Sequence, residues 1–157
     1  MEVSCNIVEA FLNRDEEKIT DAVVVHLIMG LMKSVPDDKI SKLAMNFLQK
    51  IDFGKDLEQT LSFYGEMRAS FGSIEKVTVN LIYKAAGLTY KARTLNKGRI
   101  TNKLISFLQA TISFCYITVP VLENAHLKLK LYLYLSEVAL TNNLISQANS
   151  LIKTCIT

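Results

Sequence analysis

Residues that interrupt regular secondary structure are scarce in this chain. Its 157 residues include only two prolines, Pro36 and Pro120, and six glycines. Long regular elements joined by short turns must therefore fill most of the sequence. Between these breaks, apolar residues recur at intervals of three and four, which is the spacing of one helix face. The sequence therefore predicts an all-α protein.

The same spacing sets the expected boundaries of the helices. A first helix is expected over residues 15 to about 33, with three acidic residues at the positive end of its dipole. Asp37 or Asp38 is expected to cap a second helix that runs to about residue 51. Five more helices are expected over approximately 57–71, 73–94, 99–118, 120–139 and 141 to the C-terminus.

One segment, "HLKLKLYLYLSEVAL" at residues 126–140, fits both a strand and a helix. Leucine stands at every odd position from Leu127 to Leu135, which is the alternation of a half-buried strand. The only other β-leaning run covers residues 113–119, and an isolated hairpin is marginal in water. Leucine also favours helices. Wound as a helix, the segment places Leu127, Leu131, Tyr134 and Val138 in one apolar stripe between two polar strips, so a helix is predicted.

Consecutive helices with short turns are typical of stacked antiparallel helix pairs. The segment 99–118 is apolar over more than half of its circumference, so it must pack against more than one neighbour. We find no repeat of fixed period, and the pattern therefore predicts a HEAT-like α-solenoid of the degenerate kind. Residues 1–157 are expected to form a single helical-repeat domain. A closed bundle is the alternative.

Sequence motifs for catalysis or cofactor binding are missing. His26 and His126 have no partner at the spacing of a metal site, and Cys5, Cys115 and Cys155 fit reduced thiols that pack as small apolar residues. No phosphate-binding glycine loop and no nucleophile elbow occurs. We therefore expect no enzyme, no metal and no cofactor; an enzyme whose site forms only in three dimensions is the alternative. No signal peptide is recognised, and the apolar stretches are too interrupted to predict a transmembrane segment.

Charge is distributed unevenly along the chain. Residues 1–75 hold 13 acidic and 8 basic residues, a net charge of −5, whereas residues 76–157 hold 10 basic and 2 acidic residues, a net charge of +8. No acidic residue lies between Glu75 and Glu123. The candidate basic patch in this interval consists of Lys84, Lys91, Arg93, Lys97, Arg99 and Lys103.

The basic patch has two interpretations. It is a solvated surface, or it contacts an acidic membrane, an acidic protein or a nucleic acid. We expect no nucleic acid, because Tyr83 and Tyr90 stand among apolar residues at helical spacing, where core packing explains them. The stripe of Leu127, Leu131, Tyr134 and Val138 also has two interpretations: packing against a neighbouring helix, or a partner-binding surface with a polar rim.

Three stretches carry a family resemblance: "IDFGKDLEQTLSFYGEMRASFGSIEKVTVNLIYKA" (51–85), "ISFCYITVP" (112–120) and "LKLYLYLSEVALTNNLISQANSLIK" (129–153). In this order they resemble the C-terminal helical region of the vacuolar protein sorting 35-like family, the large scaffold of the endosomal retriever complex. The resemblance covers residues from about 35 to 155. Retromer's large subunit is a more distant relative and the alternative.

The resemblance implies a non-enzymatic α-solenoid that works in cargo recycling, cytoplasmic and associated with endosomes. It also implies a partner, a small subunit with a metallophosphoesterase-like fold that the C-terminal solenoid cradles, together with other endosomal sorting proteins. Peripheral membrane association would come through the complex. Because the family protein is several times longer, we expect this chain to be a fragment. The family has no signature for its partner contacts, so the stripe on residues 127–138 rests on periodicity alone.

Overall fold

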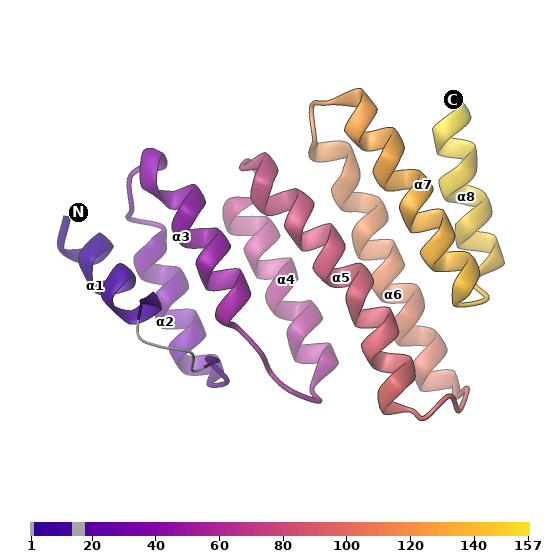
Figure 1. The fold of residues 1–157 in the computed structure, drawn as a ribbon, viewed down its shortest axis with the longest axis horizontal. Coiled ribbons are helices and arrows are strands. Elements are labelled where there is room, and N and C mark those ends of the chain that lie inside the picture. Colours follow the sequence, from indigo (N-terminus) through magenta and orange to yellow (C-terminus); the bar gives the residue numbers. More distant parts are fainter. Residues whose placement is uncertain (1, 14–17) are drawn as a thin grey trace. The chain divides into compact units, whose positions relative to one another are not determined.

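The computed structural model of the chain describes residues 2–13 and 18–157, which are mainly helical (Figure 1). The α-helices of these residues are α1 (Glu2–Leu12), α2 (Ala22–Met32), α3 (Asp37–Lys50), α4 (Leu57–Phe71), α5 (Glu75–Leu95), α6 (Asn102–Thr118), α7 (Ala125–Thr141) and α8 (Ile145–Ile156). The predicted all-α fold of consecutive helix pairs, as in a solenoid, is confirmed. The helices divide between two compact units, residues 1–60 and 61–157.

The first unit contains α1, α2 and α3. Asp21 caps α2, since its side chain accepts a hydrogen bond from the backbone N–H of Val23 at 2.8 Å. Before α2 the chain is extended, and Ile19 forms an isolated parallel bridge with Ile51. An ion pair of 3.0 Å between Lys18 and Asp52 flanks this bridge. The core of the unit is aliphatic and aromatic, with Val8, Val25, Met32, Phe47 and Leu48 almost completely buried.

The first two helices of this unit differ from the prediction. Helix α1 was not predicted, although Cys5, Val8 and Leu12 form a buried face at helical spacing. Helix α2 begins at Ala22 and not near residue 15, because the backbone around Ile19 pairs with Ile51. The acidic residues at 15–17 lie outside the described residues.

The predicted capping of α3 by an aspartate is also wrong. The N-cap residue is Pro36, and no side chain bonds to the first turn there. Asp37 and Asp38 are instead the first two residues of the helix. In that position their negative charges still stabilise the helix through its dipole.

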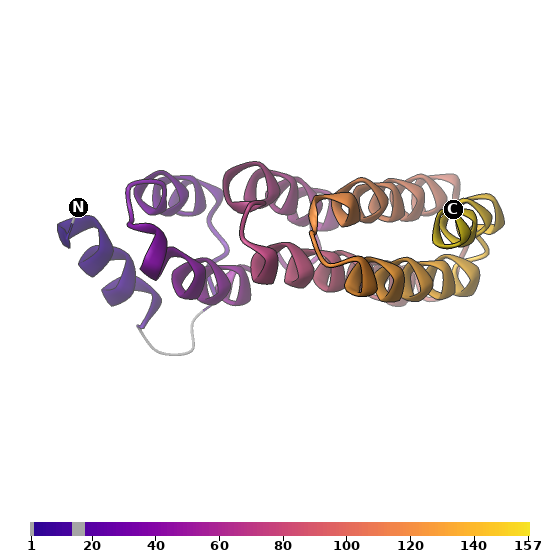
Figure 2. The ribbon, with the colours of Figure 1, turned by 90° about the horizontal axis from the view of Figure 1, so that it is seen from above.

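The second unit arranges its helices in two layers, with α5 and α7 in one and α4, α6 and α8 in the other (Figure 2). Helix α5 packs along α6, and α7 packs along α8. Leu81, Ile82, Ile112, Leu131, Leu135 and Leu151 are its largest fully buried aliphatic side chains. Buried threonines do not leave unpaired hydroxyls: Thr111 and Thr118, for example, donate to carbonyls one turn earlier at 2.8 and 2.6 Å.

The segment 126–140 lies in α7, so the helix predicted there is confirmed. Asn124 caps it by accepting a hydrogen bond from the N–H of Leu127 at 3.1 Å. Pro120 does not belong to its first turn; it lies in a separate 3-10 helix, Val119–Val121.

Helix α6 begins at Asn102 and not at Arg99, because Thr101 has an extended backbone, with φ −120° and ψ 156°, which a helix cannot pass through. Thr101 then supplies its cap, with the N–H of Leu104 donating to the hydroxyl at 3.1 Å. Helix α8 likewise begins at Ile145, four residues later than expected, because Asn143 has a φ of 59°.

Candidate interaction surfaces

The predicted partner-binding stripe lies along the edge of α7 that faces α5. Leu131 is completely buried, with 0% of its surface exposed, whereas Leu127, Tyr134 and Val138 are half-buried. The Tyr134 ring packs against Tyr83 of α5, with ring centroids 5.2 Å apart and planes tilted by 52°. The stripe therefore helps to hold α7 against α5, and three of its four members also reach the surface.

Helix α5 extends this surface with two tyrosines. Tyr83 is 46% exposed and Tyr90 77% exposed, so the expectation that core packing explains them is wrong. Gly87 lies between them at spacings of four and three, which places all three residues on one side of the helix. A Cβ atom on Gly87 would have no atom within 4 Å, so the surface between the rings is open.

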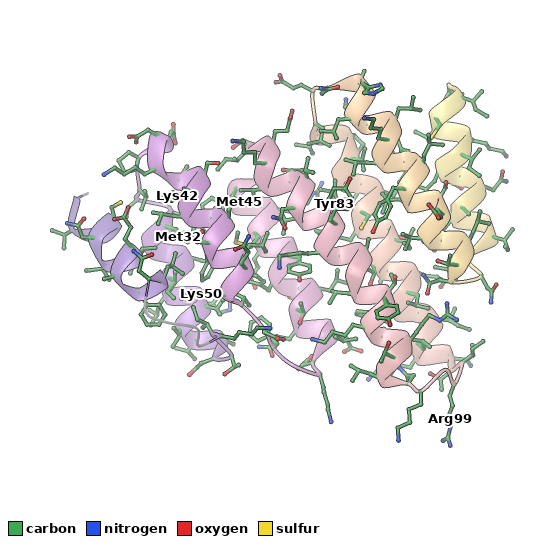
Figure 3. All side chains as sticks on the ribbon, viewed as in Figure 1. Met32, Lys42, Met45, Lys50, Tyr83 and Arg99 are labelled. Atoms are coloured by element: carbon green, nitrogen blue, oxygen red, sulfur yellow. The ribbon has the colours of Figure 1, made fainter. Side chains whose placement is uncertain are left out.

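We define the α5–α7 face by these residues of the two neighbouring helices: Tyr83, Gly87 and Tyr90 of α5, and Leu127, Tyr134 and Val138 of α7. Tyr83 is labelled on α5 in Figure 3. Exposed aromatic rings are unusual on a surface that stays in water, and they are enriched where proteins bind each other. The geometry suits the docking of a partner rather than chemistry.

The basic patch gathers mainly where α5 ends and α6 begins. Arg93 lies in the last turn of α5, Lys97 and Arg99 lie in the connecting turn, and Lys103 lies in the first turn of α6. Arg99 is labelled at this end of the unit in Figure 3. Lys84 and Lys91 are half-buried along α5, and Lys84 lies nearly two turns before Lys91. The basic patch therefore consists of a cluster at the α5–α6 end and one lysine, Lys84, that lies apart from it along α5.

Arg93 has a structural role in this patch. Its Nη1 donates a hydrogen bond of 2.6 Å to the carbonyl of Thr141 at the C-terminal end of α7. A cation at this end of a helix stabilises it through the dipole. Arg93 therefore joins the ends of α5 and α7 as well as adding positive charge.

Groups suited to catalysis do not assemble in the part of the chain that the structure describes. It contains no group of three or more histidine, cysteine or acidic side chains able to hold a metal ion. Cys115 is buried beside the carbonyl of Ile82, at 3.7 Å, and burial raises the pKa of its thiol to about 12. Such a thiol stays protonated near neutral pH and is a poor nucleophile.

In the described part of the chain, one helical stretch is long and apolar enough to cross a membrane by length and composition, which is not expected from the sequence. It is Asn102–Val121, and its mean hydropathy is 1.7. The core helix of a water-soluble protein passes the same test. In this structure α6 packs against α5, α7 and α8, and Leu104, Leu108 and Ile112 are buried there.

Consecutive packed helix pairs define a helical-repeat protein of the α-solenoid type. Comparison with known families agrees: the family model "VPS35L C-terminal domain" matches residues 1–157. The chain belongs to the VPS35L family, and the resemblance seen in the sequence is confirmed.

Relatives from several animals match along almost the whole chain. The "VPS35 endosomal protein-sorting factor-like" proteins of Mus musculus and Homo sapiens are each 33% identical over an alignment of 167 positions, gaps included. This alignment covers 99% of this chain. The "VPS35 endosomal protein sorting factor-like" protein of Drosophila melanogaster is 34% identical over 161 residues and 96% of this chain. The match spans 17% of the length of the mouse and human proteins.

Proposed function

We propose that this chain is a non-catalytic scaffold segment of a retriever-type endosomal recycling complex. In this proposal both units belong to one helical-repeat domain, which binds a small metallophosphoesterase-fold subunit through a helix face. The complex acts in the cytoplasm on endosomes, and the chain reaches the membrane only through its partners. The family match over residues 1–157 carries the proposal, and the names of the relatives as endosomal sorting factors support it.

The α5–α7 face is the proposed contact surface. Its tyrosines offer large, rigid, partly apolar area, which is the usual composition of residues that dominate binding energy. The predicted stripe enters this surface through Leu127, Tyr134 and Val138, while Leu131 supports it from below. A change of Leu131 to a charged residue would disrupt the core and is therefore no test of binding.

A second candidate function follows from the basic patch. Between Glu75 and Glu123 the chain has no acidic residue, so the α5–α6 end carries net positive charge. A basic end of this kind attracts an acidic membrane surface.

The salt dependence of binding separates the two functions. The purified chain is titrated with the metallophosphoesterase-fold subunit, and separately with vesicles containing phosphatidylserine, at low and at physiological salt. Docking through an apolar face predicts subunit binding whose Kd changes less than about threefold between the two conditions. Vesicle binding that falls about tenfold or more with salt, with no subunit binding, would favour the membrane function instead.

A further inference from the structure

A pocket of about 360 Å³ opens between the N-terminal turns of α6 and α8 in the second unit. This volume is typical of small-ligand sites. Aliphatic side chains make up half of its lining: Ile100, Leu104, Ile105, Leu108, Leu144 and Ile145. Ile100 is 71% exposed and Ile145 63% exposed, so both present apolar surface to water around the pocket.

Two buried amide oxygens among the lining residues lack a hydrogen-bond donor. The amide nitrogen of Asn142 donates to the carbonyl of Val138 at 2.7 Å. The amide nitrogen of Gln147 donates to the carbonyl of Gln109 at 2.9 Å and to the Ser113 hydroxyl at 3.0 Å. These bonds fix which atom of each amide is the oxygen.

The consequence is that Asn142 Oδ1 and Gln147 Oε1 are buried acceptors with no partner in the described part of the chain. A buried acceptor without a donor destabilises the fold. Both oxygens are covered by the chain's own atoms, so the surface that the pocket offers to a ligand is its apolar wall.

The surroundings of the pocket are basic. Arg93 is a lining residue, and Arg99 and Lys103 directly precede the lining residues Ile100 and Leu104 in the sequence. The helix ends that meet here, residues 91–105 and 137–149, contain five basic residues and a single acidic one, Glu137. This charge favours a negatively charged ligand.

We propose that the pocket docks an acidic peptide segment of a partner protein. An aliphatic side chain of the segment enters the pocket and packs against its apolar wall. Acidic residues on either side of the aliphatic one lie against Arg99 and Lys103. This site lies on different helix ends from the α5–α7 face, so it goes beyond the proposed function and does not depend on it.

The test uses three capped pentapeptides and the whole 157-residue chain. The first probe is acetyl-Glu-Asp-Ile-Asp-Glu-amide. The second has alanine in place of isoleucine, and the third has lysine at all four acidic positions. Nuclear magnetic resonance follows the backbone signals of Ile100 and Ile145 and the side-chain amide signals of Asn142 and Gln147 during titration.

The first peptide is expected to shift these signals in a saturable way. The alanine peptide should bind about tenfold more weakly because it loses the aliphatic anchor. The lysine peptide should not bind, because it carries the wrong charge.

Variants of exposed residues locate the site without disturbing the core. Ile100→Ser with Ile145→Ser should remove binding of the first peptide, and Ile156→Ser, which changes another exposed isoleucine of α8, should not. Arg99→Glu with Lys103→Glu should also remove it, whereas Lys76→Glu at the opposite end of α5 should not. Equal binding of the first two peptides, or binding that survives the isoleucine changes, would overturn the proposal. So would binding of phosphatidylserine vesicles with no binding of any peptide.

Discussion

One residue of α5, Gly87, has no packing role in the isolated chain but lies on the proposed binding surface. Gly87 lies in the middle of the helix, where alanine is more favourable by close to 1 kcal/mol. The space around it is open, so packing within this chain gives no reason for a glycine. Close approach of a partner between Tyr83 and Tyr90 is a physical reason that fits the proposed face.

The change Gly87→Ala should therefore raise the free energy of unfolding of the isolated chain by about 0.5–1 kcal/mol. Urea unfolding followed by circular dichroism measures this. Gly72→Ala is the matched comparison, because an added Cβ there would collide with the carbonyl oxygen of Arg68. Gly72→Ala should lower the stability, and a gain at Gly72 with a loss at Gly87 would contradict the structure.

The cysteines should differ in reactivity according to their burial. Cys115 is fully buried with its pKa raised to about 12, whereas Cys155 is half-buried near the C-terminus. Iodoacetamide reacts with the thiolate, so in native buffer at mild alkaline pH it should modify Cys155 and leave Cys115 unmodified. Mass spectrometry of the digested chain reads both sites. In urea, where the chain is unfolded, both cysteines should be modified equally, which is the control. Equal modification of both cysteines in native buffer as well would show that Cys115 is accessible in the folded chain.

At the scale of helices, the prediction from sequence succeeds where the signal is local. Helix α4 lies where it was predicted, because polar and glycine-containing turns bound a clear apolar spacing on both sides. Residues 126–140 form a helix because the leucine alternation has no strand to pair with. The start of α2 was mispredicted because the pairing of Ile19 with Ile51 joins residues far apart in the sequence.

The same limit applies to the candidate surfaces. Periodicity grouped Leu127, Leu131, Tyr134 and Val138 on one side of α7, but it cannot say which neighbour covers that side. The contact between Tyr83 and Tyr134 shows that α5 is the neighbour on that side, and this contact depends on how α5 and α7 pack. The pocket between α6 and α8 also depends on packing between helices that are far apart in the sequence, so no local motif indicates it.

The cap of α7 gives a prediction for a single element. The Asn124 side chain accepts a hydrogen bond from the Leu127 N–H, so Asn124→Ala should lower the free energy of unfolding by about 0.5–2 kcal/mol. Asn149→Ala is the control, because Asn149 is exposed within α8 and alanine favours a helix. Urea unfolding of the two variants should move in opposite directions. An unchanged midpoint for Asn124→Ala would mean that the cap contributes nothing.

At the scale of the whole molecule, two properties fit a scaffold. Core residues are contributed by every described helix, so the helices form a continuous structural framework within each unit. The features left at the surface of the second unit are suited to contact: an aromatic face on α5 and α7, and a basic end with an apolar pocket. A scaffold with two such surfaces can hold one partner while it recruits another.

The central claim is that a metallophosphoesterase-fold subunit binds the α5–α7 face, and calorimetric titration of that subunit tests it most directly. The variant Tyr83→Ser with Tyr90→Ser removes two exposed rings, and Ile156→Ser removes an exposed apolar side chain elsewhere. Circular dichroism confirms that each variant is folded. The account predicts that the double tyrosine variant weakens binding by about a hundredfold or more, while Ile156→Ser binds as the unchanged chain does. If the double tyrosine variant binds within about twofold of the unchanged chain, the loss is far smaller than a dominant contact would give. That result would contradict the account.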